Sequence, residues 1–255
     1  MPNIAVILAG GKGTRLGPPH RFLPKPLINI GLEPAINHVV DKFLQLQFQD
    51  GGGVEAVLVL IPEKQDLENA SFVNADEEVT GGGGEPAPPS QMNLKDHFNR
   101  WREAFYSRAS VQIEIEDPAG GSTGKGSTPI GGLAGLIKRI RDDGLRVKDG
   151  NPRQEMQDQD IVFISAGDNL FEDEFDEFAR ECELYPECVV NCYHDFHDPD
   201  RVRGRYGAVE LDDDYVVRYE EKPAAPRTDQ TKASAALYGF RWRHLLDFVE
   251  AYEQP

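Results

Sequence analysis

Cysteine is scarce in this chain of 255 residues, and its apolar runs are short. Three cysteines cannot all pair, and none forms a C-x-x-C spacing, so we expect no disulfide framework and a reducing cytoplasm. No apolar run approaches the roughly 18 residues that span a bilayer. The amino-terminal segment has no basic region or small-residue cleavage site, so no signal peptide is expected.

Positive charge is scarce as well. Only 10 lysines occur, and 27 basic residues face 44 carboxylates, which gives a net charge of −17. Such a surface argues against nucleic acid or an anionic membrane as the main partner. Solubility alone would explain the acidity. The more specific interpretation is a halophilic protein, since many carboxylates and few lysines keep a surface hydrated in a salty cytoplasm.

Carboxylates are absent from residues 1–32, where proportion would predict about five. The same segment carries four basic residues, so its net charge is +4 against −21 for the remainder. This asymmetry predicts an anion-binding site near the amino terminus.

Short apolar runs alternate with amphipathic segments and predict a single α/β domain over 1–255. We expect one doubly wound, mixed and mostly parallel sheet, Rossmann-like, with helices on both faces. The predicted strands are 4–8, 54–60, 111–116, 161–165, 188–193, 206–211, 215–219 and 235–240. The predicted helices are 34–48, 92–106, 133–141, 173–184 and one from residue 242.

Residues 62–110 interrupt this rhythm. A Gly/Pro-rich stretch cannot pack a core, so we predict a surface insertion with disorder at about 75–90. The helix at 92–106 then returns the chain, with Phe98 and Trp101 on its core face. A domain boundary in this region is the alternative interpretation.

The segment Leu8-Ala-Gly-Gly-Lys-Gly-Thr-Arg-Leu16 leaves the first predicted strand and carries the strongest chemical signal. Its glycines let the backbone approach a phosphate chain, and its basic side chains balance phosphate charge. A dinucleotide fingerprint read from Gly11 would need glycine where Leu16 stands. A P-loop read through Lys125 also fails, because Ala119 replaces its first glycine.

The glycine segment resembles the signature of the sugar-1-phosphate nucleotidylyltransferases, or nucleotide-sugar pyrophosphorylases. Further motifs of that family follow in order, and the G-D-N variant is similar to the glucose-1-phosphate thymidylyltransferase branch. These motifs are Phe22-Leu-Pro-Lys-Pro-Leu27, Ile164-Ser-Ala-Gly-Asp-Asn-Leu170, Arg205-Tyr-Gly-Ala-Val-Glu210, Glu220-Glu-Lys-Pro223 and Ala236-Leu-Tyr238.

The resemblance implies a set of site residues. Arg15 and Lys25 would act on the reacting phosphates, and Asp168 would hold Mg²⁺ as the cofactor. The implied nucleotide-binding residues are Leu8, Ala9, Gly10, Gly11, Gly13, Thr14, Asp117 and Gly132. The implied sugar-phosphate-binding residues are Gly207, which would leave room for the hexose, with Glu221 and Lys222.

Two departures from the family pattern concern which base the protein recognises and which residues bind its metal. Asp117 stands where relatives carry a base-reading glutamine, and a carboxylate cannot donate an amide hydrogen to a base. The sequence ends at Pro255, before the C-terminal extension from which relatives supply a second metal-binding aspartate.

The resemblance implies an enzyme that converts an NTP and a sugar 1-phosphate into an NDP-sugar and pyrophosphate. The expected nucleotide is dTTP or UTP. Neither nucleic acid nor a membrane is expected as a partner, and the sequence leaves open whether the protein forms a homo-oligomer. The alternatives are a non-catalytic or regulatory nucleotide-sugar-binding subunit and a transferase that acts on a non-sugar phosphate.

Overall fold

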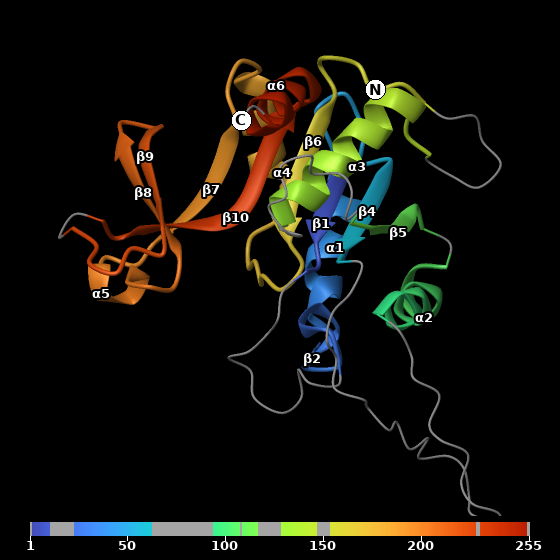
Figure 1. Cartoon of the computed structure of the whole chain (residues 1–255), viewed down its shortest axis with the longest axis horizontal. Coiled ribbons are helices and arrows are strands. Elements are labelled where there is room, and N and C mark those ends of the chain that lie inside the picture. The colour runs from blue at the N-terminus through green and yellow to red at the C-terminus, as the bar shows by residue number, and fades with distance from the viewer. Residues whose placement is uncertain are drawn as a thin grey trace, which may run out of the picture.

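The computed structural model of the chain describes residues 2–10, 23–62, 94–107, 109–116, 129–146, 154–227 and 230–253. Within these residues, an eight-stranded mixed sheet forms the centre of the molecule (Figure 1). Seven of its strands follow the order β5-β4-β1-β6-β10-β8-β9, and β7 pairs with β10. The α/β class and the mixed sheet predicted from the sequence are therefore confirmed.

Four neighbouring strands run parallel: β5 (Val111–Ile115), β4 (Ala56–Ile61), β1 (Ile4–Leu8) and β6 (Ile161–Ala166). The apolar, β-branched sequences of β4, β1 and β6 suit strands that are covered on both faces, whereas polar residues alternate along β5 at the edge of the sheet. Leu8 lies opposite both Leu60 and Ala166, so the strands reach their carboxyl ends together. This shared edge is where ligands bind in open α/β sheets.

The other four strands pair antiparallel: β10 (Lys232–Arg241), β7 (Val190–Asp195), β8 (Gly207–Asp212) and β9 (Tyr215–Glu221). The long strand β10 runs from beside β6 into an arm formed by β8, β9 and the short helix α5 (Pro199–Val202) (Figure 1). A register shift between Ser234 and Tyr238 interrupts its pairing with β7.

Helices enclose two hydrophobic cores, one on each face of the sheet. Ala5 and Ile7 of β1 join one core with α1 (Ala35–Gln45), α2 (Leu94–Tyr106) and α4 (Asp176–Leu184). Ile4 and Val6 join the other core with α3 (Pro129–Asp143) and α6 (Trp242–Glu253). The alternation of β1 side chains thus places successive residues in opposite cores.

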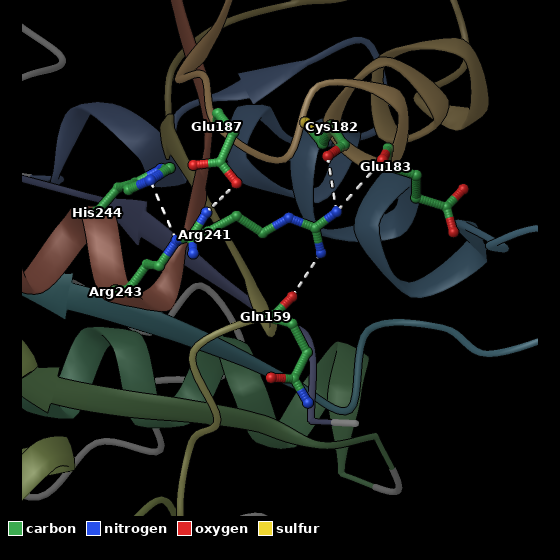
Figure 2. A network of polar contacts seen from close by, with 7 residues as sticks. All are labelled: Gln159, Cys182, Glu183, Glu187, Arg241, Arg243 and His244. Atoms are coloured by element: carbon green, nitrogen blue, oxygen red, sulfur yellow. Dashed lines mark hydrogen bonds and ion pairs between the residues drawn. The ribbon is translucent and has the colours of Figure 1, made fainter.

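Arg241 ties the end of β10 to the end of α4 (Figure 2). Its guanidinium donates to the backbone carbonyls of Gln159, Cys182 and Glu183, of which the last two lie at 3.1 and 3.4 Å. The carbonyls at a helix carboxyl end lack partners within the helix, so a cationic donor is favourable there. Arg243 reaches Glu187 in the same network.

Several element boundaries differ from those predicted. Helix α1 ends at Gln45 and not at residue 48, α4 begins at Asp176, and α3 begins four residues early, at Pro129. Four short elements were not predicted: the 3-10 helix η2 (Lys25–Leu27), the paired strands β2 (Asn29–Ile30) and β3 (Glu33–Pro34), and helix α5. The predicted disordered stretch at 75–90 lies outside the described residues. No helix in the described ranges is long and apolar enough to cross a membrane.

Candidate active site

Backbone hydrogen bonds extend the parallel strands by one residue at their carboxyl ends. Ala9 N donates to Leu60 O at 2.9 Å, and Gly167 N donates to Leu8 O at 3.0 Å. Gly167 allows this close approach, because a Cβ at that position would lie 3.0 Å from the Ile7 side chain. Ala9, Gly10 and Asp168 consequently emerge at the same edge of the sheet.

Lys25 and Asp168 form an ion pair at this edge, although 143 positions separate them in the sequence. Pro26 and Leu27 are buried and anchor η2, so the lysine leaves a fixed turn. The two side chains are 36% and 27% exposed, which leaves the pair accessible to a substrate. On the far side of Asp168, the Asn169 amide donates to the Ala235 carbonyl of β10 and fixes the loop.

Glu116 is a buried carboxylate beside this edge, and sequence reasoning missed it. Its backbone N donates to Ile61 O at 2.8 Å. A Cβ on Gly10 would lie 3.6 Å from Glu116 Oε1, and a Cβ on Gly132 would lie 2.4 Å from Glu116 Cγ. Residue 116 was predicted only as the end of the strand expected at 111–116. The residue lies one position beyond β5, where alternation no longer applies.

Gly207, Glu221 and Lys222 lie together at the paired ends of β8 and β9. Gly207 is the register partner of Glu221, and Lys222 Nζ contacts Glu221 Oε1. Lys222 has a left-handed backbone, with φ of 48°, which turns the chain at the end of β9. The Tyr219 side chain lies over Gly207, where a Cβ would be 2.0 Å from its hydroxyl oxygen. The predicted role of Gly207 toward a hexose stays a prediction.

Five predicted site residues lie outside the described residues: Gly11, Gly13, Thr14, Arg15 and Asp117. The remaining ones fall into two groups. The first group, at the carboxyl ends of the parallel strands, consists of Leu8, Ala9, Gly10, Lys25 and Asp168, with Gly132 joined to it through Glu116. Gly207, Glu221 and Lys222 form the second group on the antiparallel arm.

The residues at the strand ends offer a limited fit to a magnesium ion. Asp168 supplies a hard, partly exposed carboxylate, which Mg²⁺ can bind alongside nucleotide phosphates and water. Within the described ranges, no group of three or more His, Cys, Asp or Glu side chains is placed to hold a metal.

Two family models match the chain, one toward each end. A MobA-like NTP transferase domain matches residues 5–82, and a nucleotidyl transferase model matches residues 151–255. Together they include the glycine segment, Lys25, Asp168 and the Glu221-Lys222 pair. Both models describe nucleotide-transferring domains, so over these two ranges the chain is similar to nucleotidyl transferases.

Solved structures share the fold of this chain. One is a Bacillus anthracis protein assigned as a glucose-1-phosphate thymidylyltransferase, in complex with a sucrose. It is 18% identical with a TM-score of 0.61, and the alignment covers 99% of this chain and 76% of that one. Another is a UDP-glucose pyrophosphorylase complexed with UDP-glucose, 14% identical with a TM-score of 0.58 and coverages of 98% and 80%.

Proposed function

We propose that this nucleotidyltransferase joins an NTP to a sugar 1-phosphate and releases pyrophosphate, with dTTP or UTP and glucose 1-phosphate as the first pair to test. The Lys25–Asp168 pair at the carboxyl ends of the parallel strands carries the proposal. It sets a cation and a carboxylate that could bind a metal at the edge of the sheet from which Gly10 also emerges.

The reaction would proceed as an in-line displacement at phosphorus. A phosphate oxygen of the sugar 1-phosphate attacks the α-phosphorus, and the bond from that phosphorus to the departing pyrophosphate breaks. Lys25 and Arg15 would balance the charge that moves onto the pyrophosphate. Bound Mg²⁺ would supply further charge neutralisation, with Asp168 as its protein ligand.

The Lys25–Asp168 contact also suggests how the site accepts its substrates. Before substrate binds, the ammonium group of Lys25 offsets the negative charge of the Asp168 carboxylate. When Mg²⁺ and the triphosphate enter, Asp168 would pass to the metal and Lys25 to a phosphate oxygen. Each charged group would then exchange one opposite charge for another.

Glu116 is the reason to include guanine nucleotides in any test. An ionised carboxylate only accepts hydrogen bonds, whereas thymine and uracil each present two carbonyl acceptors beside a single donor. Guanine presents an amino donor next to its ring N–H, which suits a carboxylate. Glu116 lies against both Gly10 and Gly132, which were predicted to bind the nucleotide.

A pyrophosphate-release screen tests the proposal. Each of dTTP, UTP, GTP, CTP and ATP would be paired with several sugar 1-phosphates in the presence of Mg²⁺. We expect turnover with at least one pair, and a loss of roughly 10²-fold or more in Lys25→Ala, Arg15→Ala and Asp168→Asn. Lys95→Ala, which removes an exposed lysine of α2, serves as the control. Release of pyrophosphate without any sugar phosphate, or normal turnover in all three variants, would refute the proposal.

A further inference from the structure

Tyr219 covers Gly207 on the antiparallel arm. Gly207 pairs with Glu221 and Val209 pairs with Tyr219, so all four residues share one face of the β8–β9 pair. A Cβ on Gly207 would lie 2.0 Å from Tyr219 Oη and 2.5 Å from Cζ. Only glycine at 207 leaves space for this tyrosine.

The Tyr219 hydroxyl donates to Glu221 Oε2 at 2.8 Å. The other oxygen, Oε1, contacts Lys222 Nζ. Both oxygens of Glu221 are therefore held by neighbours, and the carboxylate plane is fixed. An ionised carboxylate offers about four acceptor positions, so each oxygen keeps one for an incoming hydroxyl group.

Both partners have the protonation state that this contact requires. Lys222 chiefly, and then the Tyr219 hydroxyl, hold the pKa of Glu221 below its usual range, so the carboxylate stays ionised. Burial, together with the hydrogen bond to Glu221, raises the pKa of Tyr219, so its hydroxyl stays protonated and able to donate.

Further hydroxyl groups continue from Tyr219 across the arm. Tyr238 of β10 is close enough to raise the pKa of Tyr219 as well. The Tyr238 hydroxyl lies 2.9 Å from Ser234 Oγ, which donates to Asn191 Oδ1 at 3.1 Å. Tyr219 thus belongs to a polar chain anchored on β7 and β10, which restricts where its hydroxyl can move.

We propose that Tyr219 is a positioning residue for sugar-phosphate binding, whose hydroxyl fixes the Glu221 carboxylate so that its free acceptor positions meet the hydroxyl groups of the sugar. This inference rests on the proposed function. It assigns to Gly207 the role of making room for the tyrosine, and to the tyrosine the role of orienting the acceptor.

The test is Tyr219→Phe, with Tyr215→Phe as a matched control on the same strand. Phenylalanine keeps the ring and removes only the hydroxyl that holds Glu221. A hydrogen bond to a charged group is strong enough that we expect KM for glucose 1-phosphate, or for the best sugar 1-phosphate, to rise about tenfold. KM for the nucleotide and the melting temperature should stay unchanged. Tyr215 is exposed, and its variant should match the wild type.

A spectroscopic titration tests the contact apart from turnover. The ultraviolet absorbance of tyrosinate should reveal a high-pKa tyrosine that disappears in Tyr219→Phe and titrates at lower pH in Glu221→Gln. An unchanged sugar-phosphate KM in Tyr219→Phe, in an enzyme that turns over normally, would overturn this inference alone. A wild-type protein that turns over no sugar 1-phosphate would overturn the proposed function and the inference with it.

Discussion

At the scale of single residues, Gly10 and Gly132 differ in what an added methyl group would meet. The nearest atoms to a Cβ on Gly10 are at 3.5 Å on Pro62 and 3.6 Å on Glu116, which are ordinary contact distances. A Cβ on Gly132 would lie 2.4 Å from Glu116 Cγ, closer than packed atoms allow. An alanine at position 10 should therefore affect substrate binding, whereas an alanine at position 132 should affect folding.

We expect Gly10→Ala to keep the stability of the wild type and to weaken nucleotide binding, because the methyl group projects where the phosphates would pass. Gly132→Ala should destabilise the protein by about 1–3 kcal/mol, since Glu116 must move within a packed site. Urea unfolding and nucleotide titration of both variants would check this. Equal losses of stability in the two would contradict the contrast.

Asp160 carries the clearest expected pH effect on stability. This residue is fully buried and directly precedes β6. Its Oδ2 accepts a hydrogen bond from Gln157 N at 2.7 Å, whereas its Oδ1 has no hydrogen-bond partner within the described residues. Burial raises the pKa of Asp160, against the opposing effects of the Gln157 N–H and Arg241. The folded state then holds a proton that the unfolded state releases, so the contribution to stability falls as pH rises.

Asp160→Asn should remove this dependence. Below about pH 4 aspartic acid is protonated in both states, so the contribution is fully present there. It is lost as pH rises through the folded pKa. Relative to the wild type, the variant should gain stability progressively as the pH rises above about 4. Urea midpoints at several pH values would measure this difference, and parallel curves for the two proteins would exclude it.

At the scale of elements, helix α2 is attached to α1 by two polar contacts within an apolar interface. Trp101 Nε1 donates to Asn37 Oδ1 at 2.7 Å, and the Tyr106 hydroxyl donates to Asp41 Oδ1 at 2.7 Å. Phe98 and Trp101 are buried, as their helical spacing predicted. Asn37 is buried too, whereas Asp41 is only partly buried.

We expect Asn37→Leu to cost about 1–3 kcal/mol of stability, because it leaves the Trp101 indole N–H buried without an acceptor. Tyr106→Phe should cost less, since the Asp41 carboxylate can turn to water. The free energies of unfolding of the two variants give the comparison. A larger loss in Tyr106→Phe would mean that the contact to Trp101 does not hold α2 in place.

Hydrophobic pattern predicted the parallel strands well and the antiparallel arm less completely. β1 occupies residues 4–8 as predicted, because a short β-branched run is what a doubly covered strand requires. β10 was predicted at 235–240 but spans Lys232–Arg241. Its first half contains Ala233, Ser234 and Ala236, which carry little strand preference. Ala236 also adopts a positive φ of 51° within the register shift, a conformation that is uncommon for alanine and that the hydrophobic pattern does not indicate.

The candidate site, like the fold, was predicted only in part from the sequence. Lys25 and Asp168 were predicted to belong to one site because each lies in a recognisable sequence motif. Their side chains do lie in contact. Tyr219 and Glu116 carried no such signal. Strand alternation assigns Tyr219 to a face of the sheet but does not give the direction of its ring, and the cover that buries Glu116 comes from α3, distant in sequence.

At the scale of the whole molecule, the two signs of charge are segregated along the chain. Residues 1–32 carry +4, and the remainder carries −21. Lys25 brings part of the basic segment to the carboxyl ends of the parallel strands. A positive site in an acidic molecule would attract polyphosphates locally while the rest of the surface repels nucleic acid.

The acidic surface leads to the final prediction, that stability rises with KCl up to the molar range. The 44 carboxylates repel one another in the folded state, and the Debye length shortens to about 3 Å at 1 M salt. We expect the melting temperature to climb most steeply at low KCl and then more slowly, because screening strengthens with the square root of ionic strength. Sucrose at equal osmolality controls for exclusion of solute from the surface, which stabilises without screening. A melting temperature that is flat or falls between low salt and roughly 2 M KCl, where screening is nearly complete, would refute the proposed halophilic adaptation. It would leave the proposed nucleotide site unaffected, because the contact between Lys25 and Asp168 does not depend on the acidic surface.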